Sequence, residues 1–143
     1  MARMYKNIEI WGLSYNFVLD MYALTEKFPE SERNNLTSQM RRAATSIPLN
    51  IAEGSSRKST KEFLNFLNYA YGSAKELDVL LSLSKDLKFV NKEEYDVAYK
   101  KLDKLMAKLY AFLQNIEKRL GNKKKFNFFQ KFEEVKQYKS DLN

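Results

Sequence analysis

The chain has 143 residues, of which 25 are basic and 18 acidic, and its formal net charge is +7. This length suits one domain, and an apolar fraction of 44% is sufficient for a buried core. The absence of cysteine and histidine excludes disulfides, Ser–His and Cys–His nucleophile pairs and ordinary zinc sites. No apolar run is long enough to cross a membrane, and the N-terminus lacks the apolar block of a signal peptide. We therefore expect a cytoplasmic protein that needs neither a membrane nor a cofactor.

The basic excess is uneven along the chain. Residues 1–28 and 59–90 are balanced, whereas 29–58, 91–121 and 122–143 each carry more basic than acidic side chains. Such a surplus suits a polyanion partner such as RNA. It equally suits ordinary solubility in a lysine-rich protein, so the charge alone does not decide between the two.

Four long segments have the apolar period of an amphipathic helix. The first, after an expected N-cap at Asn7, has as its predicted buried face Ile8, Trp11, Tyr15, Val18 and Tyr22. It ends near Pro29, which restricts the preceding residue to extended geometry. The predicted buried face of the second is Leu36, Met40, Ala43, Ile47 and Ile51. Gly54 is expected to follow the end of this helix in the left-handed conformation.

The third segment begins with a predicted capping box of Ser59 and Glu62. Its buried face is expected to be Phe63, Leu67, Ala70, Ala74, Leu77 and Leu81. Gly72 lies inside this segment, and a glycine there costs about 1 kcal/mol relative to alanine. We therefore expect Gly72 to mark a close contact between helices.

The fourth segment also begins with a predicted capping box, formed by Asn91 and Glu94, and is expected to stop at Gly121. Its apolar face is Ala98, Leu102, Leu105, Leu109, Leu113, Ile116 and Leu120. Four such helices with short connections predict an all-α, up-down-up-down antiparallel four-helix bundle over residues 1–121.

Residues 122–143 form a basic, aromatic C-terminal extension. Phe128, Phe132 and Val135 share one face of a short fifth helix, if the segment is not a flexible tail. Its mixture of lysine and aromatic side chains suits single-stranded nucleic acid, because bases stack on rings while lysines follow phosphates. Docking on the bundle or on a partner is the interpretation we favour.

A second, polar stripe runs along the second helix, through Gln39, Arg42, Ser46, Asn50, Glu53 and Arg57. It is poor in lysine and rich in short side chains, which lose little entropy when ordered. We favour an interface over a solvated face, with Arg42 and Glu53 in ion pairs across helices or subunits. Pro48 removes one backbone donor, so we expect a kink there, unless an exposed proline is tolerated in a bent helix. The oligomer-interface candidates are Gln39, Ser46, Asn50, Glu53 and Gly72.

The nucleic-acid-binding candidates are Arg41, Arg42, Arg57, Lys58, Lys61, Lys123, Lys124 and Lys125. Arginine binds phosphate in a bidentate manner, and the start of the third helix adds free N–H groups. The pair at 41–42 and the pair at 57–58 lie about four turns apart, more than roughly 20 Å along a helix. They therefore form two patches, or oligomerisation multiplies each into a ring.

The run FPESERNNLTSQMRRAATSIPLNIAEGSS, followed by STKEFLNFLNYAYGSAKEL, resembles the four-helix bundle proteins encoded within 23S rRNA intervening sequences. The resemblance covers about residues 5–120 and includes Trp11, Arg41-Arg42-Ala43 and the stretch from Ser46 to Gly54. It implies a small bacterial cytoplasmic protein that assembles as a ring-like homopentamer. It also implies distant kinship with accessory proteins of diversity-generating retroelements, which bind nucleic acid and a reverse transcriptase.

Three hypotheses follow for the function. The first is a non-enzymatic oligomeric bundle that binds RNA or DNA through basic surfaces. The second is a protein–protein adaptor that scaffolds a nucleic-acid enzyme such as a reverse transcriptase. The third, a carboxylate-dependent hydrolase or nuclease, is the weakest, because no set of acidic residues has recognisable ligand spacing.

Overall fold

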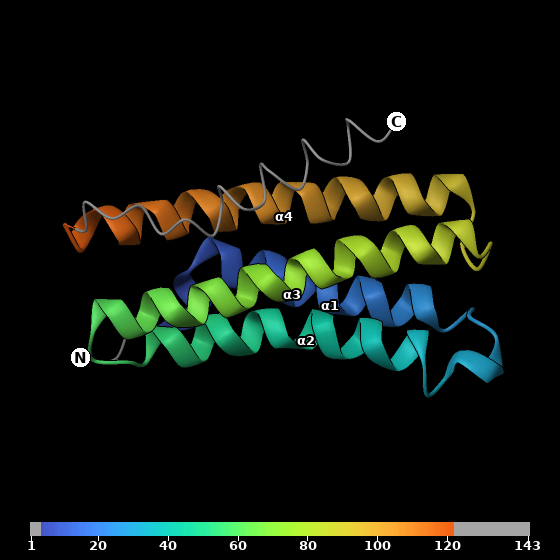
Figure 1. Ribbon diagram of the computed structural model, residues 1–143, viewed down its shortest axis with the longest axis horizontal. Coiled ribbons are helices and arrows are strands. Elements are labelled where there is room, and N and C mark those ends of the chain that lie inside the picture. Colours follow the sequence, from blue (N-terminus) through green and yellow to red (C-terminus); the bar gives the residue numbers. More distant parts are fainter. Residues whose placement is uncertain (1–3, 122–143) are drawn as a thin grey trace, which may run out of the picture.

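The computed structural model describes residues 4–121, which form a bundle of four long helices lying side by side (Figure 1). The helices are α1 (Glu9–Thr25), α2 (Leu36–Ser55), α3 (Thr60–Asp86) and α4 (Lys92–Arg119). Two short 3-10 helices, η1 (Tyr5–Asn7) and η2 (Glu30–Glu32), precede α1 and α2. Each helix packs on the next, and α1 also packs on α4, so the bundle closes. The predicted all-α antiparallel bundle is confirmed, and the extension at 122–143 lies outside the described residues.

The core is built from the faces that the apolar period predicts in three of the four helices. Every predicted core residue of α2, α3 and α4 is buried except Leu120, which is partly buried at the end of α4. These stripes step by three and four residues, so one side of each helix faces its neighbours. Local sequence was sufficient here because each of these apolar stripes keeps one helical period along its whole helix.

The predicted buried face of α1 is wrong. The side chains that α1 buries are Ile10, Ser14, Phe17, Met21 and Thr25. Tyr15 and Tyr22 are exposed, whereas Trp11 lies at the edge of the core and stacks on Tyr15 with ring centroids 5.0 Å apart. Apolar residues surround most of α1, so the period allows more than one orientation, and packing against α2 and α4 selects one.

Two hydroxyl groups make the buried face of α1 possible. Ser14 Oγ donates a hydrogen bond to the Trp11 carbonyl at 2.8 Å, and Thr25 Oγ1 donates to the Met21 carbonyl at 2.7 Å. Short hydroxyl side chains can satisfy themselves on their own helix in this way. A polar residue therefore occupies a core position without an unpaired donor, which apolar periodicity does not anticipate.

The helix caps follow the sequence signals in α3 and α4 but not in α1. The Glu94 N–H donates to Asn91 Oδ1 at 2.8 Å and the Asn91 N–H donates to Glu94 Oε1 at 3.1 Å, which confirms this capping box. At α3 the Ser59 hydroxyl accepts the Glu62 N–H, but the return bond is absent from the hydrogen bonds of the described residues. Asn7 is not the N-cap of α1; it lies in η1, and Ile8 is the capping residue. Gly121 ends α4 with a φ of +61°, as expected.

The glycines of α2 and α3 do not have the roles that the sequence predicted. Gly54 does not follow α2 but lies within it, where a Cβ atom would come 2.6 Å from the Cβ of Phe66 and 2.9 Å from Cδ2 of Phe63. A Cβ atom on Gly72 would meet nothing within 4 Å. The close contact between α2 and α3 is therefore at Gly54, and Gly72 makes no close contact within the described chain.

Helix α2 continues through Pro48, which is buried rather than exposed. Polar side chains around the proline bond to the backbone of the preceding turn. Ser46 Oγ donates to the Ala43 carbonyl at 3.0 Å, and Asn50 Nδ2 donates to the Ser46 carbonyl at 2.8 Å. These bonds support the backbone next to the position where the proline cannot donate.

Candidate nucleic-acid interface

The first candidate region is a hollow at the start of α2, which we call the arginine pocket. Its volume is about 420 Å³, and it is lined by Tyr22, Arg33, Thr37, Ser38, Arg41, Arg42 and Thr45. Tyr22 comes from α1, Arg33 follows η2, and the other residues belong to the first three turns of α2. Three guanidinium groups and three aliphatic hydroxyls thus surround one hollow, a composition that suits an anion.

Arg41 is held firmly within this region. Its Nε–H donates to Thr25 Oγ1 at 2.9 Å, and its Nη2 donates to Glu26 Oε2 at 3.1 Å. Its guanidinium carbon lies 4.5 Å from the centre of the Tyr22 ring, a cation–π contact. Arg41 therefore joins α1 to α2, and this candidate has a structural role that its position in the sequence did not suggest.

Arg42 differs from its neighbour. Its side chain is exposed and makes no ion pair or hydrogen bond within the described part of the chain, so the predicted ion pair is absent within one subunit, while a pair across subunits stays a prediction. Arg33, which was not a candidate, pairs with Glu30 at 3.1 Å on an exposed surface. Arg33 is 8 residues before Arg41 and outside the helical stripe, so periodicity could not bring it to this site.

The second candidate region, which we call the basic end, combines Arg57, Lys58, Lys61, Lys118 and Arg119. The end of α2, the start of α3 and the end of α4 all lie at the same end of the bundle (left in Figure 1). Lys58, Lys61, Lys118 and Arg119 are exposed and, among residues 4–121, make no ion pair. Lys118 and Arg119 were not among the predicted candidates, although two basic residues in the last turn of a predicted helix can be recognised in the sequence.

Arg57 is the paired member of the basic end. It forms an ion pair with Glu53, and its guanidinium carbon lies 4.9 Å from the centre of the Phe66 ring. Glu53 thus pairs with a residue four positions further along the chain, just beyond the end of α2, and not with another helix, while a pair across subunits stays a prediction. Arg42 and Arg57 are separated by about 20 Å along α2, so the two candidate regions are distinct in one chain. Lys123, Lys124 and Lys125 lie outside the described residues.

The polar stripe of α2 is in part an internal contact. The hydroxyls of Ser46 and Ser73 form a hydrogen bond between α2 and α3, and Asn50 is half-buried beside them. Gln39 and Glu53, toward the two ends of the stripe, are exposed. The centre of the stripe therefore serves the bundle itself, while an intersubunit role for its ends stays a prediction.

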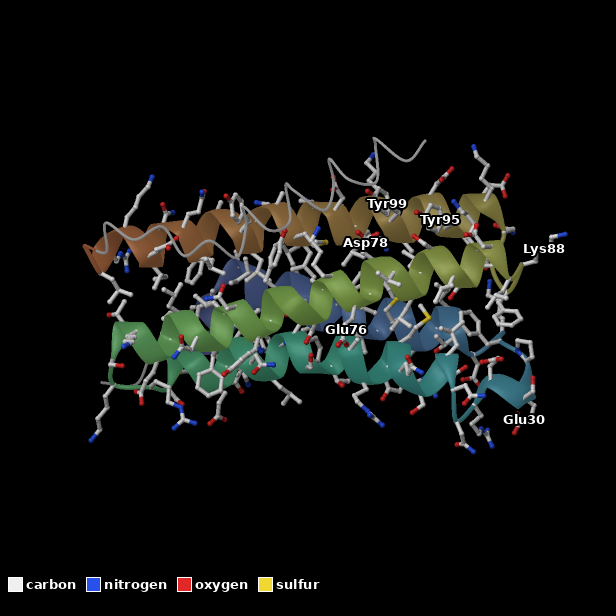
Figure 2. The ribbon with its side chains drawn as sticks, in the orientation of Figure 1. Glu30, Glu76, Asp78, Lys88, Tyr95 and Tyr99 are labelled. Atoms are coloured by element: carbon white, nitrogen blue, oxygen red, sulfur yellow. The ribbon has the colours of Figure 1, made fainter. Side chains whose placement is uncertain are left out.

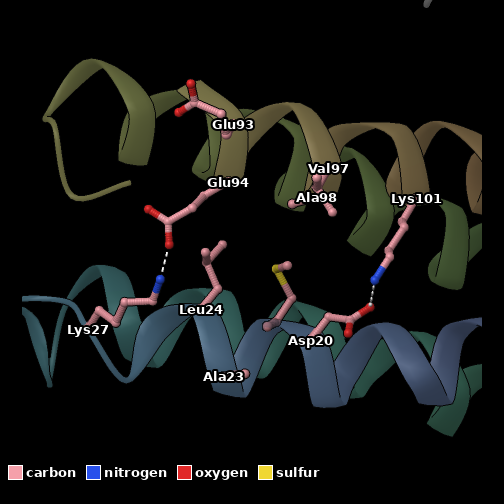
Figure 3. A pocket seen from close by; sticks show the side chains of 10 residues that line it. Asp20, Ala23, Leu24, Lys27, Glu93, Glu94, Val97, Ala98 and Lys101 are labelled. Carbon is pink, nitrogen blue, oxygen red and sulfur yellow. Dashed lines mark hydrogen bonds and ion pairs between the residues drawn. The ribbon is translucent and has the colours of Figure 1, made fainter. Parts of the chain in front are cut away.

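A groove between α1 and α4 is the second large hollow in the described residues (Figure 3). Its volume is also about 420 Å³, and its floor is apolar. Two ion pairs bridge it, one between Lys27 and Glu94 and the other between Lys101 and Asp20 at 3.2 Å. Its lining is Asp20, Met21, Ala23, Leu24, Lys27, Glu93, Glu94, Val97, Ala98 and Lys101.

A third ion pair joins α1 to α4 further along the same seam. Lys108 Nζ lies 2.6 Å from Glu9 Oε1, and this contact lowers the pKa of Glu9. Exposed pairs of this kind contribute little stability each, but their order along the two helices favours one register. The groove is thus a seam of the bundle, and no anion-binding group dominates it.

Aromatic side chains mark the other seam of α4, where it packs on α3 (Figure 2). The rings of Tyr95 and Tyr99 stack with centroids 5.6 Å apart, and Lys85 Nζ lies 4.3 Å from the centre of the Tyr95 ring. Burial raises the pKa of Tyr99, and the charges of Asp78 and Asp103 raise it further. These contacts lie between α3 and α4, whereas the arginine pocket is lined by residues of α1, of α2 and of the segment between them.

Two further features, a metal-ligand set and a membrane-spanning helix, are absent from the described residues. No group of three or more acidic, histidine or cysteine side chains in residues 4–121 comes together as a metal-ligand set. Within the same residues, no helix is long and apolar enough to span a membrane.

The fold and these regions define an all-α antiparallel four-helix bundle with cationic side chains concentrated near both ends of α2. Residues 6–111 match the family of 23S rRNA-intervening sequence proteins, and the chain belongs to that family. It is also similar to the crystal structure of a protein with unknown function from the S23 ribosomal protein family of Bacteroides thetaiotaomicron. The two sequences are 23% identical, and the TM-score of the two structures is 0.66. The match covers 73% of this chain and 97% of the other, and it shows a shared fold alone. No curated protein sequence matches the chain.

Proposed function

We propose that the protein is a non-enzymatic, homo-oligomeric bundle that binds RNA or DNA through its cationic surfaces. The observation that carries this proposal is the basic end, where Lys58, Lys61, Lys118 and Arg119 are exposed and free of ion pairs in the described residues. Unpaired cations are available to phosphates without first breaking a contact. They come together at one end of the bundle from the α2–α3 connection, the start of α3 and the end of α4, which makes a continuous strand of phosphates a suitable partner.

Salt dependence tests this proposal. Each phosphate neutralised releases counterions, so the affinity for a short single-stranded oligonucleotide is expected to fall steeply as salt rises. The double variant Lys58→Gln, Lys61→Gln is expected to reduce the slope of log affinity against log salt by about 1.4, since each single-strand contact contributes about 0.7. Fluorescence anisotropy at several salt concentrations measures the slope.

A matched control removes two lysine charges from a part of α4 outside the basic end. Lys100 and Lys104 are exposed on α4 and make no ion pair within residues 4–121. The double variant Lys100→Gln, Lys104→Gln is expected to leave the slope unchanged. If the wild-type protein binds neither RNA nor DNA at low salt, the proposal of nucleic-acid binding is wrong.

The oligomeric part of the proposal is supported by an apolar stripe on α3. Val79, Leu83 and Leu87, spaced four residues apart, are all about half exposed, as is expected of a surface that another protein covers. The family resemblance suggests a homopentamer.

Sedimentation tests the oligomer. We expect a mass several times the 16.9 kDa of the chain at micromolar concentration. Leu83→Lys should reduce this mass, because a charge at the centre of an apolar interface is left desolvated. A stable monomer of the wild-type chain would contradict the oligomeric proposal.

The same stripe supports the alternative function, an adaptor that holds a nucleic-acid enzyme such as a reverse transcriptase. In that case the apolar stripe contacts the enzyme, and the positive charge serves solubility. A chain that binds no nucleic acid at low salt and remains monomeric until the enzyme is added favours this alternative.

A further inference from the structure

Thr37 is a buried polar residue that lines the arginine pocket. It is only 7% exposed, it lines the pocket, and its hydroxyl makes no hydrogen bond within residues 4–121. Thr25, equally deep in the bundle, bonds its hydroxyl to a carbonyl of its own helix. Because the Thr37 hydroxyl retains contact with solvent and Thr37 lines the pocket, this hydroxyl is available to hydrogen-bond a ligand that enters the pocket.

The backbone around Thr37 is also available to an anion. Helix α2 begins at Leu36, whose N–H donates to Glu32 Oε2 at 3.2 Å. The side chain of Asn35, the N-cap residue, accepts no hydrogen bond from the helix. The first N–H groups of a helix have no intrahelical partner, and the helix dipole is positive at this end. Among the described residues, the N–H groups of Thr37 and Ser38 have no hydrogen-bond partner, and both residues line the pocket.

Arg33 and Arg42 can turn toward a ligand, whereas Arg41 stays bound to Thr25 and Glu26 and contributes a fixed charge. Arg42 has no ion pair in the described chain, while Arg33 and Arg41 pair with Glu30 and Glu26. The side chains of these two glutamates are 81% and 82% exposed. The Arg33–Glu30 pair is exposed on both sides and therefore weak, so a doubly charged anion held by several donors competes with it effectively.

We propose that the arginine pocket binds the terminal phosphate of a nucleic-acid strand, that is, a phosphomonoester. This inference rests on the proposed function, because the bound strand supplies the phosphate. A monoester presents three free oxygens and close to two negative charges at neutral pH, which match several converging donors. An internal phosphodiester carries only one charge and continues the chain on both sides, so it fits a ridge better than a hollow.

The dimensions and the rim of the pocket agree with a terminal nucleotide. A volume of about 420 Å³ lies within the range of small-ligand sites, about 300–1,000 Å³, and exceeds the need of a bare ion. Tyr22 lines the same hollow with a half-exposed ring beside the Arg41 guanidinium. The ring offers a surface for the sugar or base next to the phosphate.

Oligonucleotides of one sequence with a 5′-phosphate, a 3′-phosphate or only hydroxyl ends test the proposal by fluorescence anisotropy. We expect a phosphate on one end to strengthen binding about tenfold, the effect of one charged hydrogen-bonding group. Inorganic phosphate, compared with chloride at equal ionic strength, should compete away this gain. Thr37→Val, which keeps the shape and removes the hydroxyl, should reduce the gain severalfold, and Arg42→Gln should abolish most of it.

Lys100→Gln is the matched control, because it removes an equally exposed charge outside the pocket and should preserve the full tenfold gain. Equal affinity for phosphorylated and hydroxyl ends would overturn the inference while the proposed function stands. Failure of every oligonucleotide to bind would overturn both. A gain that survives in Arg42→Gln and Thr37→Val would place the phosphate elsewhere, and if Thr37→Val does not fold, Arg42→Gln alone decides.

Discussion

Gly54→Ala is expected to lower the free energy of unfolding by about 1–3 kcal/mol, although alanine is the better helix former. The added Cβ atom would lie 2.6 Å from the Cβ of Phe66, which is fixed to the backbone of α3. Relief therefore requires α2 and α3 to separate, and the packing around Phe63 and Phe66 is lost. Denaturant unfolding followed by circular dichroism measures the change.

Gly72→Ala is the matched control on the facing helix. Nothing within 4 Å meets a Cβ atom there, so the variant is expected to gain about 0.5–1 kcal/mol from the lower entropy of its unfolded chain. Opposite signs for the two variants would confirm the assignment of the close contact to Gly54. Equal destabilisation would contradict it, and a loss of oligomer mass in Gly72→Ala alone would place Gly72 at a contact between subunits.

Arg41→Ala and Arg42→Ala are expected to separate stability from binding. Arg41→Ala removes the donor to Thr25 Oγ1 and the contacts with Glu26 and Tyr22, and should cost about 1–3 kcal/mol of unfolding free energy. Arg42→Ala removes an exposed side chain without a partner in the described residues, and its stability should change by less than about 0.5 kcal/mol. Affinity for a phosphorylated oligonucleotide should nevertheless fall in Arg42→Ala.

Arg41→Lys sharpens this comparison. Lysine keeps the charge but lacks the planar guanidinium, whose Nε and Nη2 reach Thr25 and Glu26 separately, so most of the stability lost in Arg41→Ala should also be lost here. The same thermal or denaturant unfolding experiment compares all three variants. If Arg42→Ala destabilises the protein as much as Arg41→Ala, the assignment of different roles to the two arginines is wrong.

Local signals in the sequence were sufficient for most of the fold. The apolar stripes of α2, α3 and α4, the capping box of Asn91 and Glu94 and the stop at Gly121 all depend on residues within a few turns of each other. Short connections then leave few ways to join four helices. The bundle was predictable because each of these features acts over a short distance along the chain.

The candidate site was predictable only in part. Charge and spacing pointed to Arg41, Arg42, Arg57, Lys58 and Lys61, but not to which of them are free of partners. Arg41 is bound by Thr25 and Glu26 across the α1–α2 contact, and Arg57 is bound by Glu53 of α2, so the freedom of each side chain depends on its neighbours in the fold. The sequence also gave no indication that Thr37 is buried beside three arginines, because the wall of the pocket comes from three separate segments.

The four helices, the N-cap residues of α3 and α4, the buried faces of α2, α3 and α4 and the family could therefore be predicted from the sequence. Packing in three dimensions was needed to show which side of α1 faces the core, which glycine lies at the helix contact and which arginine remains open to a ligand. The reason is physical: a helix and its cap are made by neighbours along the chain, whereas burial, close approach and ion pairing depend on atoms that folding brings from elsewhere.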